Sequence, residues 1–285
     1  MKWIVKWMVW FIACSLSAGS FEWRERSGSS LELTENGRSV FVYNHGAGRQ
    51  CCYLHPVHSP GGVVVTGDGP ADHKHHRGLF WAWPIVEVGG QRADLWTLKG
   101  AEHRFERILE RNATASQASV RAEHSWMVQG KRVVKETMSI TVYSAADQAG
   151  GQARKFEVTL IIEALDQPVS IAGAPESGKG YGGFSARFAP RKATAIESSD
   201  GPVQRDEDHV AHAWAELTGS FQAGRAGLRI TSDAGNPGHP NEWCLRHYGF
   251  AGASFPGKPH YTLSPGKPVT LRYAVTVFDA AVLTQ

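Results

Sequence analysis

The densest group of side chains able to do chemistry is the run Asp72-His73-Lys74-His75-His76-Arg77. It follows a loop rich in glycine and proline and leads directly into the apolar segment 79–83. Polar residues that a long loop delivers to the start of a strand often form binding or catalytic sites. This run is therefore predicted to be the functional site.

Three uses of the run follow from its residue types. If residues 73–76 are extended, His73 and His75 project from one face of the strand and His76 from the other. A His-x-His pair can supply two ligands to a divalent metal such as Zn, Mn, Fe or Cu, with Asp72 as an orienting or ligating group. Without a metal, the imidazoles suit acid–base chemistry, because histidine titrates near neutral pH. The third reading is a hydrogen-bond network that only closes the loop.

Among these readings we favour a substrate or catalytic site. His73, His75 and His76 are predicted to act as acid–base or ligand groups, and His73 and His75 are the candidate metal ligands. Asp72 would orient one imidazole, Arg77 would bind a substrate oxygen, and His55 would line the same pocket.

Other candidate substrate-binding residues lie in three aromatic and basic segments. The glycine-rich segment 178–188 lacks the spacing of a phosphate-binding loop, and no helix is expected after it. The second segment is the apolar strand that follows the histidines, and the third is 241–249, which is otherwise a late strand with a buried Trp243. The candidates are Trp81, Tyr181, Arg187, Arg246 and His247.

Alternation of apolar and polar residues predicts an all-β protein. The dipeptide Asn36-Gly37 between segments 31–35 and 38–43 is a strong signal for a hairpin turn. Other strands are expected at 84–88, 119–128, 132–143, 156–165, 184–188, 211–217, 227–231 and 269–278. About a dozen strands without a βαβ unit favour a large antiparallel sandwich. Residues 21–285 are predicted to form this single domain.

Residues 1–20 have the order of a secretory signal peptide: basic residues, then an apolar run, then small residues. The protein is therefore expected to be exported to the periplasm or beyond the cell. Alternatively, Phe11-Ile12-Ala13-Cys14 is a lipoprotein processing box that leaves Cys14 as a lipid anchor. No later run approaches the ~18 apolar residues of a membrane helix.

Composition restricts the partners and the cysteine chemistry. The formal net charge is only +3, so no basic surface for nucleic acid is expected. Three cysteines follow the signal segment, and a bridge from Cys51 or Cys52 to Cys244 is one alternative. Three unpaired thiols are the other.

The run that contains the histidines resembles the signature of the PmoA-like family of exported bacterial proteins. The resemblance extends from 53–57 through Asp72 to Trp83, and it includes segments 180–188, 246–250 and 263–266. Lys74 departs from the family pattern, which usually has proline there. The resemblance implies a β-sandwich like that of galactose-mutarotase-type sugar enzymes and a place among carbohydrate-degradation functions.

Together these features predict an exported protein that acts on a sugar or a glycoside. The expected reaction is proton transfer by histidine at a sugar carbon or a glycosidic oxygen, as in an epimerase, a lyase or a hydrolase. A paired-carboxylate glycosidase is less well supported, because Glu157 and Glu163 are the only nominees. The rival prediction is a non-catalytic carbohydrate-binding or envelope module.

Overall fold

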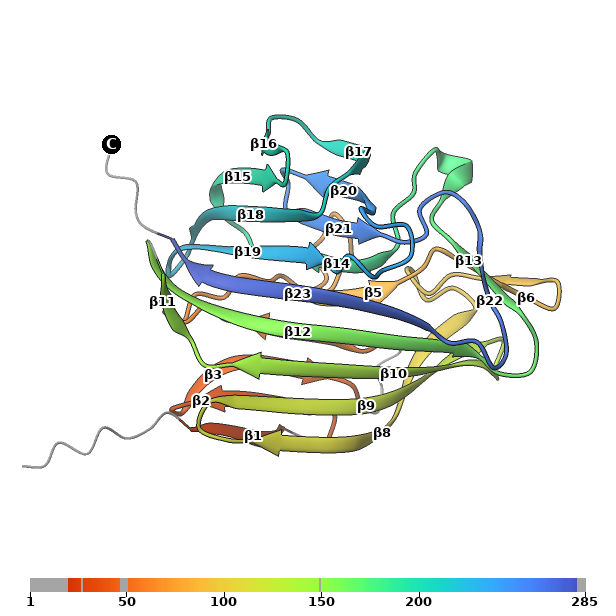
Figure 1. Cartoon of the computed structure of the whole chain (residues 1–285), viewed down its shortest axis with the longest axis horizontal. Coiled ribbons are helices and arrows are strands. Elements are labelled where there is room, and N and C mark those ends of the chain that lie inside the picture. Colours follow the sequence, from red (N-terminus) through yellow and green to blue (C-terminus); the bar gives the residue numbers. More distant parts are fainter. Residues whose placement is uncertain (1–19, 27, 47–50, 149, 281–285) are drawn as a thin grey trace, which may run out of the picture.

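In the part of the chain that the computed structural model describes, two large antiparallel sheets pack face to face (Figure 1). The described residues are 20–26, 28–46, 51–148 and 150–280. The predicted all-β antiparallel sandwich is confirmed. The predicted signal peptide and lipoprotein box lie outside the described residues. No helix in the described ranges has the length and apolarity needed to cross a bilayer.

One large sheet has nine strands and carries most of the segments that surround the histidine run. Its neighbours, in spatial order, are β1 (Phe21–Arg26), β2 (Ser30–Glu35), β3 (Arg38–Asn44), β4 (Tyr53–Val57), β5 (Leu79–Ala82), β14 (Gly183–Arg187), β21 (Phe250–Ser254), β20 (Glu242–Arg246) and β17 (Glu207–Ala211). In this order β5, which follows the histidines, pairs with β14, and β14 pairs on its other side with β21.

The other large sheet has ten strands, nine on its main path and one off it, and supplies the long strands in front in Figure 1. Its order is β16 (Gly201–Val203), β15 (Lys192–Ser198), β18 (Trp214–Phe221), β19 (Gly224–Ser232), β23 (Val269–Asp279), β12 (Gly151–Ala164), β10 (Lys131–Tyr143), β9 (Gln117–Val128) and β8 (Ala101–Ala113), with β11 (Ala146–Gln148) paired to β12.

A small third sheet lies at one end of the sandwich. Its order is β22 (Tyr261–Leu263), β13 (Val169–Ala172), β6 (Ile85–Val88) and β7 (Gln91–Ala93). A short 3-10 helix, η1 (Pro175–Ser177), follows β13. The loop after β7 carries Trp96, and the loop after η1 carries Lys179 and Tyr181, so this end of the molecule delivers side chains to the site described below.

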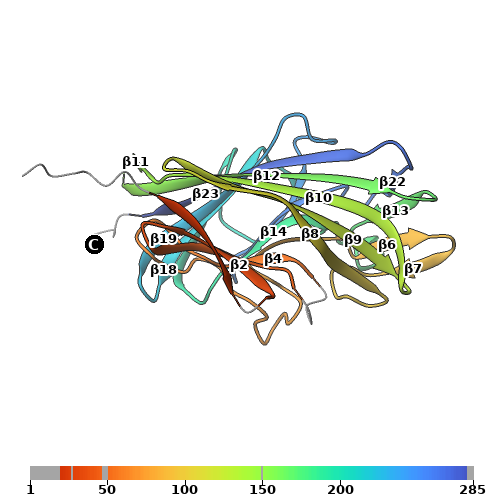
Figure 2. The same cartoon turned by 90° about the horizontal axis from the view of Figure 1, so that it is seen from below.

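The core lies between the two large sheets, which form separate layers in the view from below (Figure 2). Along β12 the inward residues alternate, so Val158, Leu160 and Ile162 are at most 1% exposed, as predicted. Rings from the two sheets meet in the core: Phe41 of β3 lies 5.7 Å from Phe156 of β12 between centroids. This burial of apolar surface is the main stabilising contribution to the sandwich.

The Asn36-Gly37 turn forms as predicted between β2 and β3. Both residues have positive φ, 52° for Asn36 and 74° for Gly37, which is the backbone shape of the tightest hairpin turns. The β9–β10 hairpin also forms, with Gln129 and Gly130 between its strands. By contrast, the 13-residue strand β8 carries charged residues on both faces at the sheet edge, so its sequence shows no alternation and the strand was not predicted.

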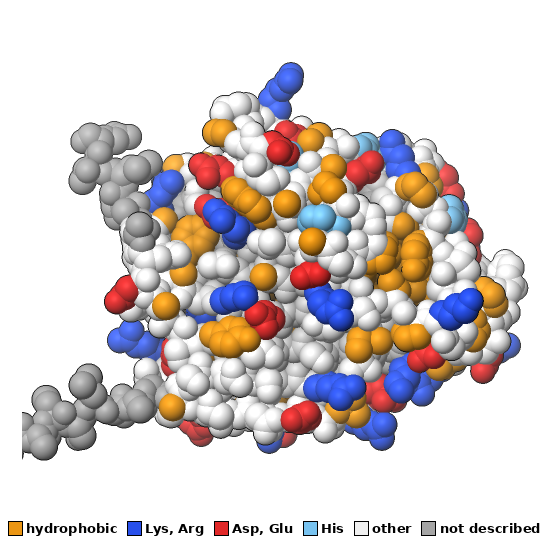
Figure 3. Space-filling model, in the orientation of Figure 1, with side chains coloured by type: hydrophobic (Ala, Val, Ile, Leu, Met, Phe, Trp, Pro, Cys, Tyr) orange, Lys and Arg blue, Asp and Glu red, His pale blue; other side chains and the backbone are white. Residues whose placement is uncertain are grey.

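Positive and negative side chains are interspersed over the outer face of the ten-stranded sheet (Figure 3). Of the two alternatives for the cysteines, a bridge to Cys244 or three unpaired thiols, the structure has the second, with Cys51, Cys52 and Cys244 free. Burial raises the pKa of the Cys244 thiol to about 12, and that of Cys52 is also well above its usual value. Buried thiols of this kind are unreactive.

Candidate functional site

The histidine run is folded into consecutive turns and is not extended. The backbone N–H of His73 donates to the carbonyl of Pro70 at 3.0 Å, and that of His76 donates to the carbonyl of His73 at 2.9 Å. The bond between His76 and His73 closes a turn, and it brings the side chains of these two residues to the same side of the backbone. The prediction that His73 and His75 share one face, with His76 opposite, is therefore wrong.

His73 and His76 stack on each other, and His75 stands across them. The ring centroids of His73 and His76 are 4.5 Å apart, with planes inclined by 18°. Tyr248 extends the stack on the other side of His73 at 5.0 Å and 14°. The His75 ring is nearly perpendicular to both imidazoles, 5.9 Å from His73 and 4.8 Å from His76.

Asp72 joins His73 to the buried Arg187. Its Oδ2 lies 2.9 Å from His73 Nδ1, and both of its carboxylate oxygens lie 3.0 Å from Arg187 Nη2. The His73 hydrogen bond, helped by Arg187, lowers the pKa of Asp72 to about 2. Asp72 is therefore ionised at neutral pH and accepts from Nδ1–H, and in the neutral form of this imidazole Nε2 is the nitrogen that can accept a hydrogen bond from substrate.

The environments of His75 and His76 differ from that of His73. His76 is 4% exposed, and burial, with the neighbouring His75 and His73, lowers its pKa to about 3. Its Nδ1 is buried and has no partner in the described residues. His75 is partly exposed, and burial also lowers its pKa. At neutral pH both imidazoles are uncharged, so His75 can accept a proton while His76 contributes packing.

Two adjoining hollows open beside these rings. We call the first, of about 160 Å³, the histidine hollow; its lining is His73, His75, His76, Trp96, Lys179, Tyr181, Cys244, Arg246, Tyr248 and Phe250. The second, of about 290 Å³, is the tryptophan hollow; its lining is Cys51, Cys52, Lys74, His75, Arg77, Phe80, Trp81, Ala82, Leu95, Trp96, Thr97, Leu98 and His103. His75 and Trp96 line both, so the two hollows share a wall.

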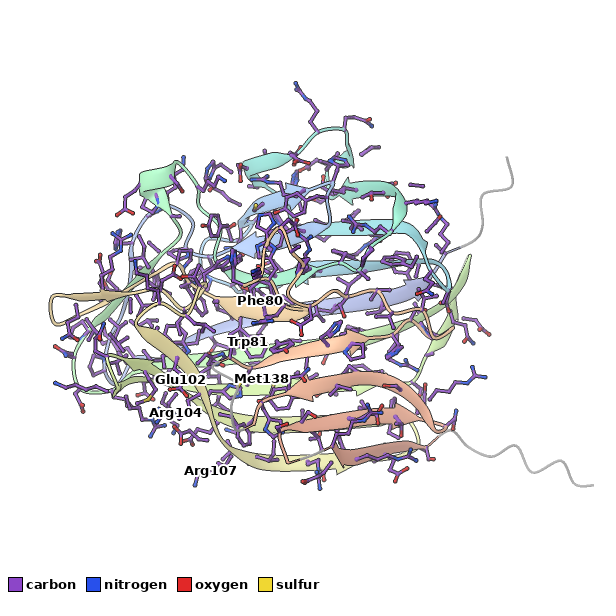
Figure 4. The ribbon with its side chains drawn as sticks, turned by 180° about the vertical axis from the view of Figure 1, so that it is seen from behind. Phe80, Trp81, Glu102, Arg104, Arg107 and Met138 are labelled. Carbon is purple, nitrogen blue, oxygen red and sulfur yellow. The ribbon has the colours of Figure 1, made fainter. Side chains whose placement is uncertain are left out.

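Several predicted substrate-binding residues line these hollows. Tyr181 packs against Trp96 at 4.9 Å between ring centroids. Arg246 lies beside them and is held by Asp208 through two hydrogen bonds of 2.7 and 2.6 Å. Arg77 and Trp81 line the tryptophan hollow. Figure 4 shows Trp81 beside Phe80 on β5, in the middle of the molecule seen from behind.

Three other candidates lie outside the linings of both hollows. His55 is in neither lining, so the prediction that it lines the same pocket is wrong; its Nδ1 lies 3.1 Å from the Thr66 hydroxyl. His247 is held by Asp206, with its Nδ1 at 2.9 Å from the carboxylate. Arg187 acts on the site only through Asp72 and through its guanidinium, which lies 4.8 Å from the centroid of the Tyr248 ring.

A buried carboxylate that the sequence did not predict lies behind the tryptophan hollow. Glu136 of β10 is fully buried, and its Oε1 accepts from His103 Nε2 at 3.1 Å and His124 Nδ1 at 2.8 Å. Trp81 Nε1 also donates to Oε1, and Trp126 Nε1 donates to Oε2, both at 2.8 Å. The Glu136 network thus ties β5 of one sheet to β8, β9 and β10 of the other.

Within the Glu136 network, the possible ligand atoms of His103, His124 and Glu136 lie within 4.8 Å of one another, which is close enough to hold a metal ion. The atoms of this group that could bind a metal already have hydrogen-bond partners, however. Oε1 accepts three N–H groups, and His124 Nε2 takes the Tyr43 hydroxyl. Burial alone would raise the pKa of Glu136, but His103 and His124 outweigh it and lower the pKa. We therefore interpret the network as an ionised carboxylate saturated by hydrogen bonds.

Residues 30–285 match a protein family described as a family of unknown function (DUF6807). A solved structure of a GH36 α-galactosidase from Geobacillus stearothermophilus, in complex with raffinose, aligns with 12% identity and a TM-score of 0.40. The alignment covers 90% of this chain, which spans 40% of the length of that enzyme. No curated protein matches.

Proposed function

The chain belongs to the DUF6807 family of unknown function, and we propose that it is a carbohydrate-directed enzyme that uses histidine as its acid and base. The observation that carries this proposal is the Asp72–His73 pair at the edge of an aromatic hollow. A carboxylate that holds Nδ1–H of an imidazole fixes its tautomer and directs Nε2 at a substrate.

The aromatic walls support a sugar as the substrate. Trp96, Tyr181 and Tyr248 line the histidine hollow together with the histidines. Rings of this kind stack on the apolar faces of sugars, while neighbouring polar groups bind the hydroxyls. The tyrosine hydroxyl of Tyr248 stays protonated, because burial raises its pKa to about 12, so it can donate a hydrogen bond to a sugar oxygen.

In the proposed reaction His73 Nε2 removes a proton from a sugar hydroxyl, a sugar carbon or a bound water. Asp72 stabilises the resulting imidazolium through its existing hydrogen bond, and this bond, with the one from Arg187, keeps Asp72 ionised. His75, uncharged at neutral pH, is the second group able to transfer a proton in the same hollow. Epimerisation, elimination and hydrolysis all need such a pair of proton-transfer groups. The alternative proposal is that His73 and His75 bind a divalent metal.

The test is a screen of purified protein against native and oxidised glycosides, with product detection by mass spectrometry. Wild type should convert at least one glycoside, and His73→Ala and His75→Ala should each lose that activity. His260→Ala is the matched control, because His260 bonds Ser170 and lies outside both hollow linings. Sugar binding without turnover would instead support a non-catalytic carbohydrate-binding module, and elemental analysis of the same sample tests for a metal.

Export also remains a proposal. We expect the mature chain to begin near residues 19–21, or at an acylated Cys14, and to form one domain over 21–285, in keeping with the resemblance to PmoA-like exported proteins. Mass spectrometry of protein recovered from the periplasm tests this. An intact Met1 on cytoplasmic protein would contradict both versions.

A further inference from the structure

We propose that the two hollows bind a sugar that carries a negatively charged group, and that Lys179 receives this group. The inference rests on the proposed function, because it names the class of substrate for the same site. It comes from the hydrogen-bonding types of the side chains that line the hollows and from the charges behind them.

The linings contain cationic donors without matching carboxylate or amide acceptors. Four cations line the hollows: Lys74, Arg77, Lys179 and Arg246. Among the described residues, no Asp, Glu, Asn or Gln lines either hollow. Lysine and arginine can only donate hydrogen bonds, whereas an ionised carboxylate can only accept them. A ligand that fits this surface must therefore be rich in acceptors.

The charges of the two arginines are already neutralised, and those of the lysines are not. Arg77 Nη1 donates to Asp68 at 2.8 Å, and Arg246 donates to both oxygens of Asp208. Lys74 and Lys179 are exposed, and their side-chain ammonium groups have no hydrogen-bond or ion-pair partner in the described part of the chain. Their ammonium groups are therefore the charges that a ligand can compensate.

The nearby carboxylates are committed to other partners. Asp72 holds His73 and Arg187, and Asp94 accepts from the backbone of Trp96 and Thr97 and from the Thr97 hydroxyl. A neutral sugar presents hydroxyls that donate as well as accept, and it would find few acceptors here. An anionic sugar supplies the acceptor oxygens itself.

Lys179 is better placed than Lys74 to bind the charged group. It lies in the histidine hollow with Tyr181 and Trp96, where a sugar ring can stack. Its main chain is fixed, because its N–H donates to the carbonyl of Ala174 at 3.1 Å. The hollows measure about 160 and 290 Å³ and share the His75–Trp96 wall, so together they reach the ~300–1,000 Å³ usual for ligand sites.

The experiment is isothermal titration of the full chain with matched sugars. The probes are glucuronate and galacturonate, their neutral methyl esters, and glucose and galactose. Glucose 6-sulfate and glucose 6-phosphate separate a carboxylate requirement from a general requirement for an anion. Each titration is repeated with Lys179→Met and with Lys155→Met. Lys155→Met is the control, because Lys155 lies on β12 of the ten-stranded sheet and pairs with Glu157.

Wild type should bind at least one anionic sugar about ten-fold or more tightly than its neutral partner, since hydrogen bonds to charged groups are the stronger ones. Lys179→Met should remove that difference, and Lys155→Met should keep it. Equal binding of anionic and neutral sugars would overturn the inference and leave the proposed function standing. An anion preference that persists in Lys179→Met would overturn the assignment to Lys179. Binding of no sugar of either class would overturn the inference together with the sugar-directed function.

Discussion

The imidazoles of His73 and His76 lie nearly parallel, with ring centroids 4.5 Å apart, because a turn places residues three apart on the same side. The two rings nevertheless have different environments. Asp72 holds the accessible His73, whereas His76 packs against Phe250 with 4.8 Å between centroids and has a buried Nδ1 that is unpaired among the described residues. One ring is therefore suited to proton transfer and the other to packing.

Truncation of neighbouring histidines should separate these two uses. His75→Ala should abolish glycoside turnover and change the free energy of unfolding by less than about 1 kcal/mol, because the side chain is only partly buried. His76→Ala should instead cost about 2–4 kcal/mol, because it leaves a cavity beside Phe250 and Trp96. Denaturant unfolding and a turnover assay measure both. A large loss of stability in His75→Ala would show that His75 is part of the scaffold.

The buried His76 should make stability depend on pH. Its pKa is about 3 in the folded protein against 6.5 for the unperturbed group, so the unfolded state binds the proton more readily. The stability it supports is present above pH 6.5 and is lost as pH falls toward 3, by up to about 1.4 kcal/mol per pH unit.

His76→Phe isolates this effect, because phenylalanine keeps the aromatic packing and cannot be protonated. We expect the variant to unfold at a similar temperature to wild type at pH 7.5 and at a higher temperature at pH 4.5. Thermal unfolding at several pH values measures the difference. Parallel curves for the two proteins across this range would contradict the assignment of a buried, uncharged His76.

The sequence predicted local structure well and long-range contacts poorly. Asn36-Gly37 predicts a hairpin turn from two residues, and alternation in β12 identifies its buried face, because both signals are local. The shared face of His73 and His75 was expected on the condition that residues 73–76 are extended, and nothing in a run of polar residues distinguishes an extended segment from a turn. Tyr248 stacks on His73 from 175 residues further along the chain, a contact that no spacing rule reveals.

Glu136 shows the same limit more clearly. In the sequence it stands in an ordinary strand, and His103 and His124 look isolated. Their partnership depends on the register of β8, β9 and β10, in which Glu136 pairs with His124 and His103 pairs with Trp126. Glutamate at an inward strand position beside histidine and tryptophan, once the hairpin register is known, is the signal that would have found it.

Asp72→Asn should reduce turnover with little effect on substrate binding. Asparagine can present its amide oxygen to His73, but it has no charge to stabilise the imidazolium that forms in the reaction, so we expect kcat to fall about 100-fold. KM should change by less than about three-fold, because Asp72 is outside the hollow linings. Steady-state kinetics on a glycoside from the screen measure both. The control is Asp147→Asn, whose exposed carboxylate accepts from Gln152, and an unchanged kcat in Asp72→Asn would show that Asp72 does not act through His73.

Glu136→Leu and Glu136→Gln test whether the buried carboxylate is a structural hub between the two sheets. Leucine removes every acceptor and leaves the N–H groups of Trp81, Trp126, His103 and His124 unpaired, each at a cost of about 1–3 kcal/mol. Glutamine keeps one acceptor oxygen but turns its NH2 group toward one or more of these N–H donors. We therefore expect the free energy of unfolding to fall by about 3–5 kcal/mol.

The free energy of unfolding, from denaturant titration, should therefore fall in the order wild type, Glu136→Gln, Glu136→Leu. If the leucine variant does not fold, Glu136→Gln carries the comparison alone. Glu157→Gln is the control, because its exposed carboxylate pairs with Lys155 and contributes at most about 1 kcal/mol. Wild-type stability in Glu136→Gln would mean that the carboxylate is protonated in the folded protein, since a neutral acid and an amide would then be equivalent. The lowered pKa of Glu136, which His103 and His124 maintain against burial, argues for the ionised form and hence for the larger loss.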